Sequence, residues 1–201
     1  MTPIIRELNL QPYEAIWRQM QTFTAARTAQ TDDEIWLTEH LPVYTLGLNG
    51  RREHLLNTGS IPVVQTDRGG QVTYHGQGQA IVYVLLDLHR LGFHAQHLVS
   101  LLENAMIQTL ADYQLCAFAK ADARGVYVNN KKIGSIGLRI KKKGCYHGLS
   151  LNNNMDLTPF SFINPCGFQN LQMTQLADFG IMVNTQTLAQ QMASYLIQYL
   201  Q

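Results

Sequence analysis

The segment SFINPCGFQN, residues 161–170, sets one cysteine, Cys166, between a proline and a glycine. Proline restrains the backbone on one side and glycine frees it on the other, so a tight turn that presents the sulfur is expected. A cysteine thiolate is a nucleophile, and a nearby cation or backbone N–H groups favour it. The same N–H groups could stabilise the oxyanion of an acyl transfer. Cys116 and Cys145 lie in apolar surroundings, which is typical of small structural residues.

The glycine-rich stretch RGGQVTYHGQGQ, residues 68–79, is a second candidate site. Its glycines let the backbone approach a ligand closely, but their spacing matches neither a Walker loop nor a dinucleotide-binding motif. Arg68 adds a cation, and His75 adds a group that titrates near neutrality. A glycine-rich hairpin with a hydrogen-bonded histidine is the alternative. The position between two predicted strands favours a ligand-binding loop.

A candidate base follows in GVYVNNKKIGSIG, residues 125–137. Neighbouring side chains of a strand point to opposite faces, so one of Lys131 and Lys132 is expected to face solvent and the other the interior. A desolvated lysine can serve as a base or hydrogen-bond partner. His75 and His147 are equally available to the thiol of Cys166. Residue chemistry alone leaves lysine-assisted and histidine-assisted mechanisms open.

The elements that must position these residues follow from apolar periodicity. Helices are predicted near residues 11–27, 97–113 and 185–201. Extended segments are expected at 35–38, 43–46, 61–66 and 80–87, the last of them buried on both faces. Turn signals at Asn129-Asn130 and Lys142-Lys143-Gly144 predict an antiparallel meander over 125–152. Helices on a mixed or antiparallel sheet make an α/β or α+β fold, here one domain over residues 1–201.

The composition argues against several function classes. A net charge of +1 over 201 residues argues against non-specific nucleic-acid binding, and no apolar run reaches the length of a membrane span. The N-terminus lacks the pattern of a secretory signal. Three cysteines without a CxxC pair, and HAQH at 94–97 without HExxH, predict neither disulfides nor a zinc site. A reducing cytoplasm is the expected compartment.

Three stretches in this order, RGGQVTYHGQGQ, GVYVNNKKIGSIGLRI and HGLSLNNNMDLTPFSFINPCG, resemble the lipoyl(octanoyl) transferase family. EHLPVYTLG at 39–47 is similar to that family's early segment, and the resemblance covers most of the chain up to Gly167. Gln77 and Asn153 stand where the family more often has proline and valine. The resemblance implies the fold of the biotin protein ligase and lipoate–protein ligase catalytic domains, which is a mixed sheet with flanking helices plus a smaller antiparallel sheet.

The resemblance also implies roles for particular residues. Cys166 of NPCG would carry the acyl group as a thioester, and Lys132 of the KIGSIG segment would stabilise the thiolate and act as acid and base. The implied substrate-binding residues are Arg68, Gly69, Gly70, Gln71, Val72, Thr73, Tyr74, His75, Ser135, Ile136, Gly137, Gly148, Leu149 and Ser150, with His147 as a further pocket residue.

The function that the resemblance implies is octanoyl (or lipoyl) transfer from acyl carrier protein to a specific lysine of apo lipoyl domains, the first step of endogenous protein lipoylation. The acceptors would be the E2 subunits of 2-oxoacid dehydrogenases and the glycine cleavage H protein, with no cofactor and no metal. Arg51-Arg52 and the cluster Arg139, Lys141, Lys142, Lys143 are candidates for docking an acidic carrier. An ATP-dependent lipoate–protein ligase and a non-catalytic acyl-binding module are the alternatives. Cys166 argues against the ligase, which needs no cysteine nucleophile.

Overall fold

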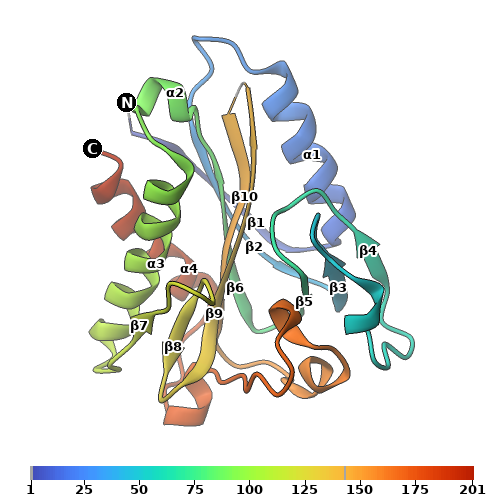
Figure 1. Ribbon diagram of the computed structural model, residues 1–201. Coiled ribbons are helices and arrows are strands. Elements are labelled where there is room, and N and C mark those ends of the chain that lie inside the picture. Colours follow the sequence, from blue (N-terminus) through green and yellow to red (C-terminus); the bar gives the residue numbers. More distant parts are fainter. Residues whose placement is uncertain (1, 143) are drawn as a thin grey trace.

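A seven-stranded mixed sheet with helices on both faces forms the centre of the molecule (Figure 1). The structure, a computed structural model, describes residues 2–142 and 144–201. Across the sheet the strands are β1 (Ile4–Gln11), β2 (Glu34–His40), β6 (Gln79–Leu85), β10 (Gly144–Asn152), β9 (Lys131–Lys141), β8 (Val126–Val128) and β7 (Phe118–Ala119). β1 and β2 are parallel, and every other neighbouring pair is antiparallel. The predicted mixed sheet and the meander are confirmed.

The helices sandwich this sheet because its central strands are apolar on both faces. They are α1 (Tyr13–Ala26), α2 (Leu88–Leu91), α3 (Ala95–Asp112) and α4 (Thr185–Tyr199). In β6, Val82 and Val84 pack with α3 and α4, whereas Tyr83 and Leu85 pack with α1 on the opposite face (Figure 1). Burial of β6 on both faces is therefore confirmed. Among the described residues, no helix combines the length and the apolar composition that a membrane crossing requires.

A smaller sheet lies on the α1 side of the molecule (Figure 1). Its strands are β4 (Val63–Gln65), β3 (Val43–Leu46) and β5 (Val72–His75), in that order. The β3–β5 pair is antiparallel as predicted, but β3 and β4 are parallel, so the prediction of a purely antiparallel sheet is wrong. The physical reason is the long connection over 47–62, which brings the chain back before β4 starts, as parallel pairing requires.

The edge strand β1 was not expected from the sequence. Most of its side chains are exposed, including Ile4 and Ile5. Two adjacent isoleucines are followed by two charged residues, so apolar and polar residues do not alternate continuously along the strand. The bounds of the other predicted strands differ little from the observed ones, and the strand predicted at 61–66 is the shorter β4. Lys143, in the predicted turn between β9 and β10, lies outside the described residues.

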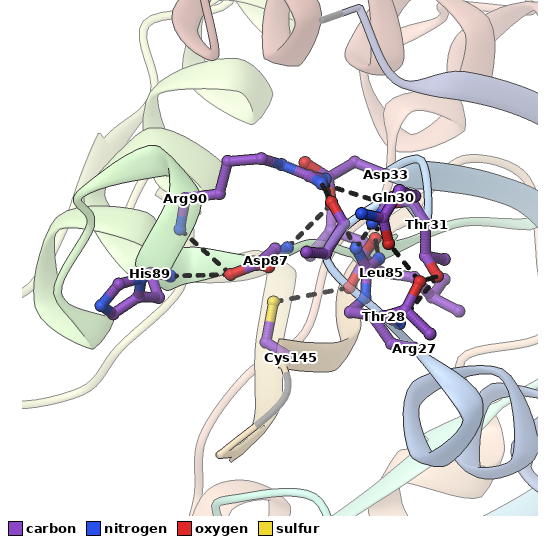
Figure 2. Close-up of polar contacts among 12 residues, drawn as sticks. Arg27, Thr28, Gln30, Thr31, Asp33, Leu85, Asp87, His89, Arg90 and Cys145 are labelled. Carbon is purple, nitrogen blue, oxygen red and sulfur yellow. Dashed lines mark hydrogen bonds and ion pairs between the residues drawn. The ribbon is translucent and has the colours of Figure 1, made fainter.

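A buried carboxylate, Asp33, joins four elements through hydrogen bonds and ion pairs (Figure 2). Its Oδ1 accepts a hydrogen bond from Arg27 Nη1 at 2.8 Å and from the backbone N–H of Asp87 at 2.8 Å, and it lies 2.8 Å from Arg90 Nη2. Arg27 also donates to the carbonyl of Leu85 at 2.6 Å. The network links the end of α1, the start of β2, the end of β6 and α2.

Replacing Asp33 by alanine is expected to destabilise the fold by about 3–5 kcal/mol, because a buried cation loses its partner. The side chains of Arg27 and Asp33 are only 2% and 5% exposed. Urea unfolding followed by circular dichroism measures the change. Glu14→Ala is the control, since the Arg18–Glu14 pair is exposed and is expected to contribute less than about 1 kcal/mol. Equal effects of the two substitutions would contradict the prediction.

Candidate active site

Cys166 lies in a short 3₁₀ turn, Pro165–Gly167, which sits against β5. Cys166 has φ 57° and Gly167 φ 79°, so two consecutive residues adopt the left-handed conformation. For a residue with a side chain this conformation costs about 1–2 kcal/mol, and the surrounding contacts must hold it. The N–H of Gly167 donates to Asn164 O at 2.9 Å, and the N–H of Asn164 donates to His54 O at 2.9 Å. The predicted tight turn is confirmed, and it leaves the cysteine half-buried.

Lys132 points into the protein from the start of β9, whereas Lys131 is exposed. Lys132 is 1% exposed. Its Nζ donates to the carbonyl of Arg124 at 2.6 Å and to Cys166 Sγ at 3.2 Å. The ring of Tyr127 lies 5.5 Å from the same nitrogen. The prediction that one of the two lysines faces inward is confirmed.

The chain that follows the cysteine turn runs beside β9 and explains how residues 34 positions apart meet. The N–H of Lys132 donates to Gln172 O at 2.8 Å, and the N–H of Thr174 donates to Lys132 O at 2.9 Å. Lys132 and Met173 form a parallel bridge. Two backbone hydrogen bonds thus connect the lysine to the segment that leads away from Cys166.

A largely apolar cavity of about 200 Å³ opens beside Cys166. The predicted residues that line it are Arg68, Gly70, Gln71, Val72, Thr73, His75, Ser135, Ile136, Gly137, His147, Gly148, Leu149, Ser150 and Cys166. The lining residues that sequence reasoning missed are Tyr13, Ile81, Tyr83, Asp122, Ala123, Arg124 and Phe168. Alternation in β6 could have indicated Ile81 and Tyr83, since they share the face opposite Val82.

Two predicted pocket residues, Gly69 and Tyr74, are not part of this lining. Tyr74 points to the other face of β5, where its ring packs 5.5 Å from the rings of Tyr44 and Phe160. Gly69 donates its N–H to the carbonyl of Leu138 at 2.8 Å and connects the loop to β9. Both residues therefore contact other parts of the protein and not the cavity.

Arg68 is buried and organises the glycine-rich loop through oxygen acceptors. Its guanidinium donates to Thr45 O at 2.6 Å, to Gly69 O at 2.8 Å and to Gln71 O at 2.8 Å. The hydroxyl of Thr45 accepts two further bonds at 2.8 and 3.0 Å. The cation therefore holds the loop in shape and places a positive charge in the wall of the cavity.

The two histidines considered as partners of the thiol are bonded to other groups. His75 Nδ1 lies 2.7 Å from Gln79 Oε1, and His147 Nε2 lies 3.1 Å from Asp67 Oδ1. Burial lowers the pKa of both rings, which favours neutral imidazoles. Burial alone would raise the pKa of Asp67, but hydrogen bonds from His147, Tyr146 and other side chains hold it well below its usual range. Of the three candidate partners, Lys132 is the one whose contact with the sulfur is observed.

The buried histidines are expected to make the fold less stable in mild acid. Burial lowers the pKa of His40 to about 4 and that of His75 to about 3. Between pH 6.5 and these values the unfolded chain binds protons that the folded chain does not. Stability should therefore fall as the pH decreases, by about 1.6 kcal/mol for each histidine between pH 6.5 and 5.

Urea unfolding at several pH values checks this expectation. His75→Gln should show a smaller loss between pH 6.5 and 5, whereas the exposed His89→Gln should keep the loss of the parent chain. An unchanged pH dependence in His75→Gln would contradict it.

Among residues 2–142 and 144–201, no group of three or more histidine, cysteine, aspartate or glutamate side chains could hold a metal ion.

Comparison with known proteins assigns the chain to a family. The sequence model of the lipoyl protein ligase A/B catalytic domain matches residues 11–197. The chain belongs to this family. Within the family it is similar to curated octanoyltransferases, and the predictions of this family and of an acyltransferase are confirmed.

Two of these relatives illustrate the similarity. The octanoyltransferase of Coxiella burnetii (strain Dugway 5J108-111) is 57% identical over 177 residues, which cover 88% of this chain and 73% of that protein. The octanoyltransferase of Laribacter hongkongensis (strain HLHK9) is 51% identical over 192 residues, which cover 96% of this chain and 93% of that protein.

Solved structures of low sequence identity share the fold. A lipoate-protein ligase A bound with ATP has a TM-score of 0.73 at 13% identity, covering 98% of this chain and 83% of that chain. The biotin protein ligase from Aquifex aeolicus in complex with biotin and ATP has a TM-score of 0.62 at 11% identity, covering 98% and 70%. The predicted similarity to both ligase classes is confirmed for the fold.

Proposed function

We propose that the chain, as one catalytic domain, transfers an octanoyl (or lipoyl) group from acyl carrier protein to a specific lysine of apo lipoyl domains through a thioester on Cys166. The observation that carries this proposal is the 3.2 Å contact between Lys132 Nζ and Cys166 Sγ beside an apolar cavity of about 200 Å³. The relatives named octanoyltransferase support the identity of the acyl group.

In the first half-reaction the amine of Lys132 takes the thiol proton, and the Cys166 thiolate attacks the carbonyl carbon of the carrier thioester. The tetrahedral oxyanion collapses by breaking the bond to the carrier sulfur, which receives the proton from Lys132. One thioester replaces another of similar energy, so the enzyme-bound acyl group stays activated. The acyl chain is proposed to occupy the apolar cavity, with the glycine-rich loop close to it.

In the second half-reaction the amine of the acceptor lysine attacks the Cys166 thioester. Lys132, neutral after the first half, takes a proton from this amine, and the cysteine sulfur leaves. The product is an amide, which is more stable than the thioester and drives the transfer. Because the donor is already a thioester, the reaction needs neither ATP nor a metal.

The proposed donor docks through Arg51 and Arg52. Both side chains are exposed, and Glu53 separates them from His54, whose carbonyl accepts a hydrogen bond from the N–H of Asn164, the residue before the turn of Cys166. Of the other predicted basic cluster, Arg139 and Lys141 lie at the far end of β9, about 23–30 Å along the strand from Lys132. The pair at 51–52 therefore suits an acidic carrier protein better.

The proposed acceptors are the lipoyl domains of 2-oxoacid dehydrogenase E2 subunits and the glycine cleavage H protein. The proposed compartment is the reducing cytoplasm, where a catalytic thiol stays reduced.

Intact-protein mass spectrometry tests this function. The protein is mixed with octanoyl–acyl carrier protein, or separately with octanoate and ATP, and its mass is measured before an acceptor domain is added. One octanoyl adduct with the carrier thioester, discharged by an apo lipoyl domain, is expected. Transfer only with octanoate and ATP would indicate a ligase, and the absence of any adduct or transfer would indicate an acyl-binding module.

A further inference from the structure

One peptide group connects a buried carboxylate of α3 to the proposed base. The carbonyl of Arg124 accepts a hydrogen bond from Lys132 Nζ at 2.6 Å. The N–H of the same peptide, on Gly125, donates to Glu103 Oε1 at 3.1 Å. Glu103 is 5% exposed, and the proposed mechanism has not used it. A carboxylate, a peptide group and the lysine thus form a continuous hydrogen-bonded chain that ends at Cys166.

We propose that Glu103 is a positioning residue that directs the Arg124–Gly125 carbonyl at Lys132 and so stabilises its ammonium form beside the Cys166 thiolate. Hydrogen bonds at both ends of an amide polarise it, and they strengthen one another where the local dielectric constant is low. Negative charge at the N–H end increases the negative partial charge on the carbonyl oxygen. The inference rests on the proposed function, because it assigns Lys132 the role of acid and base.

The backbone at Gly125 shows how closely this peptide is fitted to the lysine. Gly125 has φ 127°, a conformation that residues with a side chain rarely adopt. A β-carbon at this position would lie 2.7 Å from Lys132 Cε, 2.9 Å from Lys132 Nζ and 2.5 Å from Gly134 O. Only glycine lets the peptide approach the amine, and a rotated peptide would lose either the carbonyl or the N–H contact.

The side chain of Arg124 provides a second contact with the same carboxylate. Its Nη1 lies 3.7 Å from Glu103 Oε2, and the Arg124 side chain is 44% exposed. Glu103 thus contacts both the backbone and the side chain of the segment that supplies the carbonyl. This double contact favours one orientation of the loop between β7 and β8.

Other titratable groups surround the hydrogen-bonded series that runs from Glu103 to Cys166, and the substitutions tested below leave them unchanged. Burial raises the pKa of Tyr127 to about 12, so its hydroxyl stays protonated. The charged or titratable groups near Lys132, Cys166 and Glu103 are Arg68, Asp122, Tyr127, Lys120, His54 and Arg124. Because every variant keeps these groups, a difference between variants reports on Glu103.

The rate of Cys166 alkylation by iodoacetamide, measured against pH and located by peptide mass spectrometry, tests the inference. Glu103→Gln keeps an oxygen acceptor for the Gly125 N–H but removes the charge, and Glu103→Leu removes both. In Glu103→Gln the midpoint of the profile should move up by about one pH unit, with a kcat about tenfold lower. Glu103→Leu should lower kcat by about a hundredfold. KM for the donor should not change, since Glu103 does not line the cavity.

Glu39→Gln is the matched control. Its carboxylate also accepts a glycine N–H, from Gly78 at 2.7 Å, but in another loop. This variant should keep the alkylation profile of the parent chain. Thermal unfolding identifies variants that do not fold. If Glu103→Leu does not fold, the nearly isosteric Glu103→Gln alone tests the inference.

The outcomes separate this inference from the function on which it rests. A folded Glu103→Gln with the parent profile and kcat would overturn the role of Glu103. An equal shift in Glu39→Gln would also overturn it, since the effect would then be a general one of losing a carboxylate. If the parent protein forms no octanoyl adduct, the proposed function fails. The alkylation profiles would then still show whether Glu103 affects the reactivity of Cys166.

Discussion

Replacing Cys166 by alanine is expected to abolish the octanoyl adduct and to lower transfer at least about 10³-fold. The sulfur is the atom that accepts the acyl group in the proposed mechanism, and among the described residues that line the cavity Cys166 is the one with a thiol. Alanine keeps the β-carbon, so the left-handed turn is no more strained than with cysteine. The loss should therefore appear in activity and not in stability.

The measurement is intact-protein mass spectrometry after mixing with octanoyl–acyl carrier protein, combined with the rate of acceptor octanoylation. Cys116→Ala is the matched control, because Cys116 is an exposed free thiol far along the chain from the turn. The expectation that Cys116 is a small structural residue is therefore wrong, whereas Cys145 is buried as expected. Cys116→Ala should keep both the adduct and the rate. An adduct that persists in Cys166→Ala would show that another residue carries the acyl group.

Replacing Lys132 by methionine is expected to lower kcat by about 10²–10⁴-fold, the usual contribution of a general acid–base group. Methionine fills most of the buried space of the lysine but cannot exchange a proton with Cys166, 3.2 Å away in the parent protein. Binding of the donor should persist, since Lys132 lies behind the cavity wall and does not line it. Lys132→Ala should show the same loss of turnover.

Steady-state kinetics and donor binding by calorimetry check this expectation. The control is Lys131→Met, which removes the adjacent, exposed lysine and should leave kcat within about twofold, as for other surface substitutions. Full turnover in Lys132→Met would eliminate the proposed Cys166–Lys132 pair. A loss of donor affinity without a loss of kcat would instead assign Lys132 to binding.

Much of the fold was predictable because its central elements have strong local patterns. β6 is an apolar run that must be buried on both faces, and α3 has helical spacing over most of its length. β1 was missed because an exposed edge strand carries no such pattern. The parallel pairing of β3 and β4 was missed because direction depends on a long connection and not on the residues of either strand.

The sequence by itself determined the chemistry that is available. It contains a cysteine held between proline and glycine, two lysines of which alternation sends one inward, and a glycine-rich loop. The tertiary structure decided which of these groups meet. It brings Lys132 to the sulfur and bonds His75 and His147 to other side chains, and it places Tyr74 outside the cavity. It also revealed Glu103 behind the lysine, since a contact made through one peptide group between α3 and β9 depends on packing. Local sequence patterns record which face a side chain takes, whereas the partner on that face is set by distant segments of the chain.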